Sequence, residues 1–260
     1  MTPFAQWIAF YTMIRKDIVR MFRIWVQTFL PSVMTSVLYF LVFGKVLGAQ
    51  IGEVQGVAYM TFVVPGLVML SIITTSYANT SFMFFTSKFF ARSIEELLVS
   101  PMPAWLLIAG FTVGGVVRGV FTGMLVFAAA LFFTGLTIPI ASVLIILGFA
   151  ILTALFFSLA GLVNGIYAKS IDGINIVPTF VLTPLIYLGG VFYSVHGLPE
   201  WWQSLTYMNP LFYIINGFRF GFLGITDVSL PVSFGVLLMM TGVLVATNWY
   251  LVRKGLGLKQ

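Results

Sequence analysis

Charged residues are scarce in this sequence, which has 260 residues of which only 8% are charged and 60% are hydrophobic. A soluble domain carries roughly 25% charged residues, because its surface must be solvated by water. So few charges exclude an ordinary soluble protein and predict a chain that is solvated largely by lipid. We therefore expect one integral membrane domain over residues 1–260. The net charge of +6 need not indicate nucleic acid, because basic residues in membrane proteins usually mark the cytoplasmic loops.

Cysteine is absent and histidine occurs once, at His196. The lack of cysteine excludes disulfides, thiolate metal sites and cysteine nucleophiles. A single histidine cannot build a metal site or a catalytic triad by itself, so we interpret His196 as a loop residue.

The sequence also lacks a phosphate-binding loop, since Gly44-Lys45 has no partner glycine at the required spacing. All seven acidic residues fall in loops or near the termini, so paired carboxylates within the membrane are not expected. An ion-coupled carrier normally needs ionisable or unwound sites at the midplane. We expect no enzymatic activity in this chain, and any energy for transport must come from elsewhere.

Six apolar segments are long enough to cross a hydrocarbon core, which requires roughly 20 residues of helix. They are residues 24–43, 57–85, 105–133, 141–167, 174–192 and 232–252. Before them, residues 1–22 repeat apolar side chains every three or four positions, with basic residues between, as in a helix that lies in the membrane interface. The predicted fold is an all-α integral membrane protein with six transmembrane helices and an N-terminal amphipathic interfacial helix.

Basic residues set the orientation. With the N-terminus inside, the inner segments hold ten of the thirteen Lys and Arg residues and the outer segments hold two, Lys45 and Arg219; Arg118 lies within a span. Cytoplasmic loops are enriched in Lys and Arg. Both termini are therefore expected in the cytoplasm, and residues 194–227 are expected on the outer side.

Residues 194–227 contain a Trp- and Pro-rich passage followed, after Asn209-Pro210, by an apolar piece too short to span. Non-helical backbone at membrane depth is tolerated only where protein covers it or water reaches it. This segment predicts an outward-facing re-entrant helical hairpin between the fifth and sixth spans. Glu200 and Arg219 flank it, and they either pair across it or remain solvated.

The loop at residues 86–104 can form a short amphipathic helix that Pro101 and Pro103 end. Taken alone, it is equally consistent with an ordinary solvated loop on the basic side of the membrane. A functional interpretation of this loop depends on the sequence pattern in the predicted hairpin.

The ordered pattern P-x-x-Y-x-x-G, L-P-x-W, N-P-L-x-Y and R is similar to the C-terminal signature of ABC-2 type transporter permeases. It is carried by Pro184, Tyr187, Gly190, Leu198, Pro199, Trp201, Asn209, Pro210, Leu211, Tyr213 and Arg219. No single piece is specific, whereas the ordered set is. The resemblance implies a structural role in the outer hairpin for Pro199, Trp201, Asn209, Pro210 and Arg219.

The same resemblance implies that residues 86–104 are a coupling loop that docks into an ATPase. The docking residues would be Arg92, Glu95, Glu96, Ser100 and Pro101. Such permeases are half-transporters of the bacterial inner membrane, in which two copies pair with two separate ATPase subunits. ATP and Mg²⁺ would be bound by those partners, and no cofactor or metal is expected in this chain.

Arg118 lies inside the third span, where an unpaired charge costs at least about 2.5–3.5 kcal/mol. It either lines a substrate path or gate, or it sits closer to the cytoplasm and pairs internally. Around it, Gly115, Gly119 and Gly123 recur at every fourth position. That spacing allows two helices to approach closely, and packing within the chain is favoured over a subunit contact.

The sequence therefore predicts the permease subunit of an ATP-driven exporter that moves a hydrophobic or lipid-linked substrate outward. The path would be lined partly by Phe and Met side chains at a dimer interface. The alternative is an ATP-independent channel, scramblase or carrier that acts alone.

Overall fold

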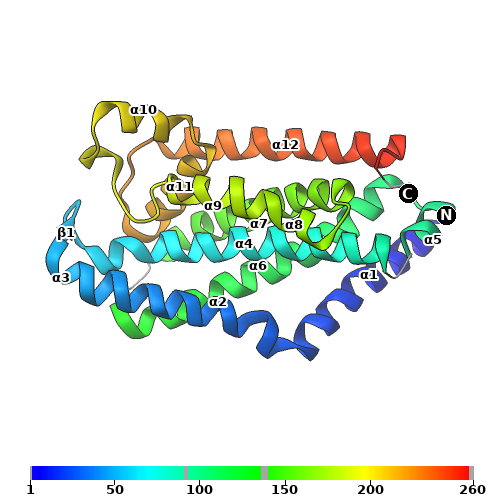
Figure 1. The fold of residues 1–260 in the computed structure, drawn as a ribbon, viewed down its shortest axis with the longest axis horizontal. Helices are drawn as coiled ribbons and strands as arrows, with labels where there is room; N and C mark the ends of the chain where they lie inside the picture. The colour runs from blue at the N-terminus through cyan, green and yellow to red at the C-terminus, as the bar shows by residue number, and fades with distance from the viewer. Residues whose placement is uncertain (1, 91–92, 136–139, 258–260) are drawn as a thin grey trace.

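The computed structural model describes residues 2–90, 93–135 and 140–257. Within them the chain forms an elongated helical bundle, and Figure 1 shows most of its helices running along the long axis. Five continuous helices are long and apolar enough to cross a membrane: Trp25–Ile51, Tyr59–Phe89, Ala104–Thr134, Val143–Tyr167 and Leu230–Lys254. The expectation of an all-helical membrane fold is thus confirmed at this coarser level.

The first of these helices is longer than the sequence predicted. It comprises α2 (Trp25–Tyr39), the π-helix η1 (Phe40–Leu47) and α3 (Gly48–Ile51). The helix continues beyond residue 43, where the sequence predicted the end of the first span, and it includes the polar residues that follow. A short hairpin then leads into the next helix, and the sequence did not indicate it. Its two strands, β1 (Glu53–Val54) and β2 (Val57–Ala58), have two residues each.

The centre of the bundle is α4 (Tyr59–Phe89), which is buried along most of its length. It packs chiefly against α6 (Ala104–Thr134) and α7 (Val143–Tyr167). The 3₁₀-helix η2 (Ile140–Ser142) leads into α7, which also packs against α12 (Leu230–Lys254). The other helices surround this central group.

One lysine ties the helix ends together beside the two termini. Lys88, near the end of α4, is buried and donates hydrogen bonds to the carbonyl oxygens of Ile166 at the end of α7 and Gly257 after α12. The last carbonyls of a helix lack partners within the helix and carry its negative dipole end. Lys88 therefore satisfies one acceptor at the end of α7 and another in the turn that follows α12.

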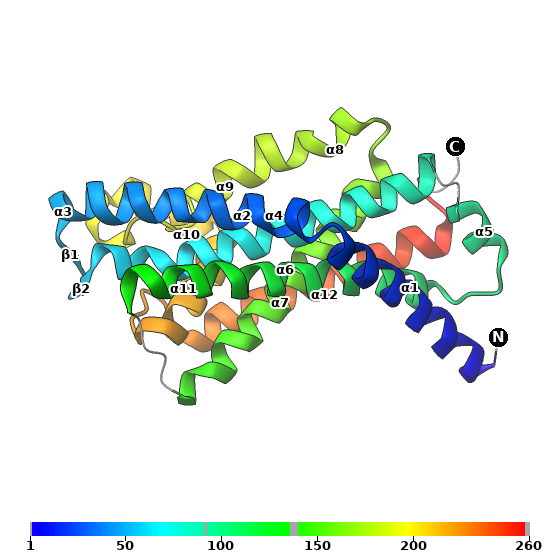
Figure 2. The ribbon, with the colours of Figure 1, turned by 90° about the horizontal axis from the view of Figure 1, so that it is seen from below.

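The N-terminal helix α1 (Pro3–Arg23) meets α2 at a bend at Ile24. Figures 1 and 2 show it running obliquely from the end that holds both termini toward the middle of the bundle. It packs against α6, where Met13 and Asp17 rest over Gly110 and Gly114. Its aromatic side chains are mostly exposed, as an interfacial helix requires, and a location in the interface stays a prediction.

The fifth apolar segment forms a shorter helix than expected. It comprises α8 (Ile171–Val177), the π-helix η3 (Pro178–Leu182) and α9 (Thr183–Tyr187). Seventeen residues span about 26 Å as a helix, which is slightly less than the roughly 30 Å of a hydrocarbon core. A count of six spans therefore stays a prediction.

The outer segment contains the 3₁₀-helix η4 (Val195–Gly197), α10 (Glu200–Met208) and α11 (Pro210–Leu223). These elements gather with β1 and α3 at the end of the bundle opposite the termini and α5 (Ser93–Val99), as Figure 1 shows. The helix break falls at Asn209-Pro210, as the sequence predicted. That the two helices re-enter the membrane remains a prediction.

Glycines bring the central helices into close contact. A Cβ atom on Gly119 or Gly123 of α6 would meet side chains of Ser76 or Ile72 on α4. On α7, a Cβ on Gly161 would overlap the carbonyl oxygen of Tyr77 and lie 3.2 Å from its Cα. The glycine rows therefore pack within the chain, which confirms the interpretation that the sequence favoured.

We expect Gly161→Ala to lower the thermal midpoint of the purified protein, because the backbone of Tyr77 cannot move without separating α4 from α7. Overpacking of this kind typically costs about 1–3 kcal/mol. Gly148→Ala is the matched control on the same helix, because a Cβ there meets nothing within 4 Å. The control should retain or slightly raise the midpoint, since Ala favours helix over Gly. Equal loss in both variants would contradict close packing at Gly161.

Candidate functional site

A long groove runs along one side of α4. Its floor is α4, one wall is α1 and α2, and the other wall is the helix from α8 to α9. The part nearer the two termini, named the inner part, has a volume of about 570 Å³. The part nearer the opposite end, named the outer part, has a volume of about 300 Å³. Pro31, Ser32 and Thr74 line both parts, so the two cavities are continuous.

Polar side chains line much of this groove. In the outer part the lining includes Ser32, Thr35, Ser36, Ser71, Thr74 and Thr183. Phe and Met side chains contribute only at the inner end, as Met21, Phe82 and Met83. Phe and Met side chains therefore line the groove in part, beside hydroxyl and amide groups, and that this groove is the substrate path stays a prediction.

Arg118 occupies the inner end of the groove. It lies fourteen residues after the start of α6, about 21 Å along the helix axis. Its Nη1 donates to Oδ1 of Asn79 on α4 at 2.8 Å, and its buried Nε has no partner. Arg20 of α1 is exposed and lines the same cavity. The site thus collects two guanidinium groups from different helices.

Asp17 is the acidic residue of this inner cavity. Its carboxylate lies against Gly114 on α6, one turn before Arg118. Burial raises the pKa of Asp17 to about 6, and the neighbouring Arg20 and Lys16 offset only part of that effect. Among the described residues the structure records no ion pair between Asp17 and Arg118 or Arg20.

Aromatic side chains close the outer end of the groove. The hydroxyls of Tyr39 on α2 and Tyr187 on α9 form a hydrogen bond of 3.0 Å. Phe192 stacks on Tyr187 and on Phe43, with ring centroids 5.8 Å and 4.5 Å away, respectively. These contacts join α2 to α9 and the turn after it at the end of the outer part of the groove.

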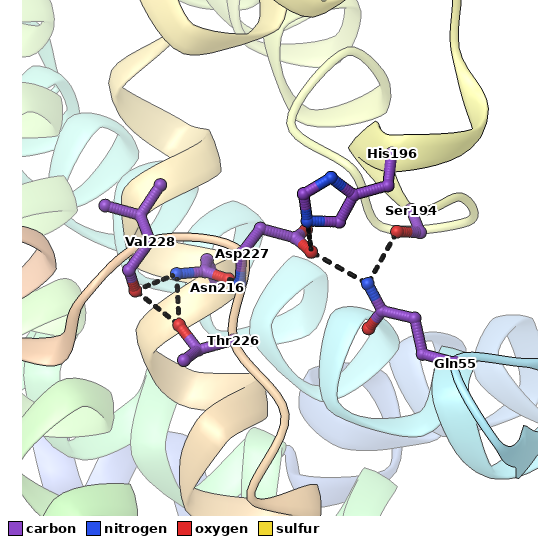
Figure 3. Close-up of polar contacts among 7 residues, drawn as sticks. All are labelled: Gln55, Ser194, His196, Asn216, Thr226, Asp227 and Val228. Carbon is purple, nitrogen blue, oxygen red and sulfur yellow. Dashed lines mark hydrogen bonds and ion pairs between the residues drawn. The ribbon is translucent and has the colours of Figure 1, made fainter.

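A polar cluster above this closure ties three loops together, as Figure 3 shows. The amide of Gln55, in the turn between β1 and β2, donates to Ser194 Oγ and to Asp227 Oδ1, each at 2.8 Å. His196 Nε2 lies 3.2 Å from the same carboxylate oxygen. Asn216 of α11 holds the loop after it, accepting from Asp227 N at 2.8 Å. The outer loops are therefore connected to each other through Asp227.

The residues predicted to support the outer hairpin lie at its joints. Pro199 precedes α10, and Pro210 is the first residue of α11. Asn209 is buried, accepts from Leu211 N at 3.0 Å and donates to Leu185 O at 2.6 Å, so it fixes the break between α10 and α11 to α9. Trp201 is largely exposed and packs on Trp202.

Arg219 takes neither of the arrangements expected for it. It is buried, and its Nη2 donates to the carbonyl oxygen of Gly190 at 2.6 Å. Its Cζ lies 4.0 Å from the ring centroid of Phe62. Glu200 is exposed and does not pair with it. The guanidinium instead secures the turn after α9, where Gly190 has a positive φ of 80°.

The predicted docking residues lie at the end of the bundle that carries both termini. Arg92 falls outside the described residues, and Glu95 lies in α5 (Ser93–Val99). Glu96 and Pro101 are exposed, while Ser100 Oγ donates to Leu97 O at 2.7 Å and ends the helix. Of the described docking residues, Glu96, Ser100 and Pro101 do not line the cavity of Arg118 and form no hydrogen bond with the outer cluster.

Several groove residues were missed by reading the sequence. No role for Asn79 followed from the sequence, although an amide in an apolar helix needs a partner and could have been matched to Arg118. Asp17 lies in the segment predicted to be an interfacial helix, and its packing against Gly114 of α6 was not expected. Gln55 and the Tyr39–Tyr187 pair carried no local signal, because their partners lie more than a hundred residues away.

We expect Asp17→Asn to stabilise the protein increasingly as pH rises from 4 to 7. A raised carboxyl pKa means that the folded state binds the proton more tightly, so stability is lost as pH rises from the ordinary value of 3.8 to about 6. The gain should reach at most about 3 kcal/mol, since one pKa unit corresponds to about 1.4 kcal/mol.

The measurement is the thermal midpoint in detergent of Asp17→Asn and the unchanged protein across that pH range. Asp172→Asn, at an exposed acidic residue, is the control. A constant difference between Asp17→Asn and the unchanged protein from pH 4 to 7 would contradict the burial of this carboxyl.

Comparison with known proteins supplies the family. The model of the ABC-2 type transporter family matches residues 8–223. Inner membrane transport permease YadH of Escherichia coli K12 is 51% identical over 253 residues, which cover 97% of this chain and 98% of that protein. Nodulation protein J of Rhizobium meliloti is 27% identical over 233 residues, with 89% and 86% covered.

These matches extend over nearly the whole chain, including α1, the groove, α5 and most of the outer segment. The near full-length similarity to an inner membrane permease and the long apolar helices identify a multi-pass protein of the bacterial inner membrane. The chain belongs to the ABC-2 type transporter family and is a transport permease.

Proposed function

We propose that this chain is the membrane subunit of an ATP-driven exporter and moves a hydrophobic or lipid-linked substrate outward. Two copies would assemble with two copies of a separate ABC ATPase, which would bind ATP and Mg²⁺. The end of the bundle with both termini would face the cytoplasm. The outer hairpin, which would comprise residues 194–227, would cover the exit on the other side.

The observation that carries this proposal is the construction of α5. Ile94 is almost fully buried among Phe84, Leu107 and other apolar side chains, so α5 is anchored in the bundle. Its other side presents the exposed Glu96 and the almost fully exposed Val99 at the end of the molecule. An anchored helix with apolar and acidic side chains left uncovered suits a docking contact for an ATPase.

The groove supports the direction of transport. It leads from the half of the bundle near the termini, at Arg118, to the aromatic closure at Tyr39 and Tyr187. Polar side chains facing lipid are unfavourable, and a second copy placed over the groove would enclose them. Two grooves facing each other would form a path that is closed at its outer end in this conformation.

The N-terminal helix supports the same assembly. Phe4, Trp7, Tyr11 and Trp25 are each more than half exposed. Aromatic rings of this kind favour the headgroup region of a membrane. The contact of α1 with α6 at Gly110 and Gly114 would carry a movement of this helix directly to the helix that bears Arg118.

The test is to co-express the chain with the ABC ATPase encoded beside it and to change the exposed face of α5. We expect the double variant Glu96→Lys, Val99→Asp to lose most co-purified ATPase, by about tenfold, because it reverses a charge and places a carboxylate on the apolar contact. Nucleotide-driven substrate transport into proteoliposomes should fall in parallel. Ile94 is left unchanged so that α5 remains anchored.

Glu53→Lys provides the control, because it makes the same charge change at an exposed position in the opposite end of the molecule. It should retain ATPase association. Full association of the double variant would refute docking at α5. Transport by the purified chain without any ATPase would instead establish an independent channel, scramblase or carrier.

A further inference from the structure

The inner end of the groove holds positive charge that the chain does not neutralise. Arg118 has one amide partner, Asn79, and a buried Nε that has none. Among the described residues the recorded ion pair is that of His196 with Asp227, at the far end of the molecule. A guanidinium at this depth is unfavourable unless it is paired or hydrated, so the site is incomplete without an anion or water.

A second cation faces the same space from another helix. Arg20 of α1 lines the cavity with Arg118 of α6, and it is exposed. Two guanidinium groups repel each other across a cavity, and an oxyanion between them relieves both charges. Arginine is the side chain best suited to this, since its fork of donors fits the oxygens of phosphate in pairs.

The acidic residue that lines the cavity can offset only one of these two cations. Asp17 makes no ion pair with either arginine among the described residues. Burial against α6 raises its pKa to about 6, so its proton is held more tightly than that of an ordinary carboxyl group. Near neutral pH this carboxyl is still mostly ionised, so it balances one positive charge and leaves the other for a bound anion.

Neutral donors surround the charged groups. The side chains of Gln27, Ser32, Thr75 and Asn175 line the same cavity. Thr28 also lines it, and its buried hydroxyl has no partner. The volume of about 570 Å³ lies in the range of cavities that hold whole small ligands. The cavity therefore has room for a phosphate together with a polar group attached to it.

The helices that border the groove are apolar on their exposed sides. Met34 and Leu38 of α2 and Phe180 of η3 are each more than half exposed. A groove that carries both polar and apolar side chains between apolar helices fits an amphiphile, whose head would occupy the groove while its tails remain among lipid. A purely hydrophobic passenger would leave the hydroxyls and both cations without partners.

We infer that the inner end of the groove binds the phosphate group of an amphiphile through Arg118, Arg20 and the surrounding amides and hydroxyls. That this amphiphile is the exported substrate rests on the proposed function, whereas the binding itself does not. The two are separable, because binding requires neither the ATPase nor ATP.

The experiment measures lipid retention by native mass spectrometry on the purified chain in a neutral detergent. The probes are dioleoyl phosphatidic acid and dioleoylglycerol, which share their tails and differ in the phosphate group. We expect preferential retention of phosphatidic acid. Arg118→Gln and Arg20→Gln should each reduce that retention by about tenfold, because each removes charge-assisted hydrogen bonds.

Arg15→Gln is the matched control, since Arg15 is exposed on the same helix as Arg20 and does not line the cavity. It should bind as the unchanged protein does. Arg20→Gln also guards against misfolding, because the side chain that it replaces is exposed. Displacement of phosphatidic acid by millimolar glycerol 3-phosphate would support the phosphate site and assign it to a soluble phosphate ester.

Equal retention of the two lipids would overturn the inference, as would unchanged retention in Arg118→Gln and Arg20→Gln. The double variant Glu96→Lys, Val99→Asp separates this inference from the proposed function. It should retain phosphatidic acid normally while it loses the ATPase. If it loses neither, docking at α5 fails and the phosphate site stands.

Discussion

The bilayer core offers no hydrogen bonds, and this constraint accounts for most of the polar geometry in the chain. Each buried polar group must find its partner inside the protein. Arg219 does so at the carbonyl of Gly190, Asn209 at the carbonyl of Leu185, and Lys88 at the carbonyls of Ile166 at the end of α7 and of Gly257 after α12. In each case a side chain satisfies backbone acceptors exposed by a turn or a helix end. Breaks in helices are therefore placed where a polar side chain covers them.

The groove collects polar groups of this kind on one side of α4, its two arginines among them. The Thr28 hydroxyl and the Arg118 Nε are buried there without a partner, as other groups such as Ser76 and Thr153 are elsewhere in the described bundle. The two groove groups differ from those others in lining a cavity, where water or a ligand can reach them. In the proposed function, a second copy, water and a bound headgroup would each satisfy part of this surface, and the headgroup would have to be exchangeable.

Much of the fold could be predicted because lipid imposes a simple pattern. Long apolar runs gave four of the five long helices at nearly their observed positions, and the lack of charge excluded a soluble fold. The first helix was extended too little because Gly48 and Gln50 were read as loop, although the backbone continues through them as helix. The predicted fifth span, residues 174–192, ends later than the observed helix Ile171–Tyr187. The difference arises because Gly190 turns the chain after α9 although apolar residues continue beyond it.

The site was less accessible to sequence analysis. Arg118 stood out because a charge is rare in a span, but its partner Asn79 lies 39 residues away, and the cavity around it is lined by residues of α1, α2, α4, α6 and α8. The role of Arg219 followed from its place in a family pattern, whereas its actual contacts with Phe62 and Gly190 depend on tertiary packing. Residue types can be read locally, but which of them share a cavity depends on long-range contacts.

The position of α4 has a mechanical consequence. Its last turn is fastened by Lys88 to the ends of two neighbouring helices, α5 follows almost directly, and the groove floor between Leu70 and Asn79 lies on the same unbroken rod. A force applied at α5 would reach this rod through the packing of α5 against α4. It would tilt the rod as a lever whose far arm passes beneath the cavity, so that work done at one end of the molecule becomes a change of shape in the groove.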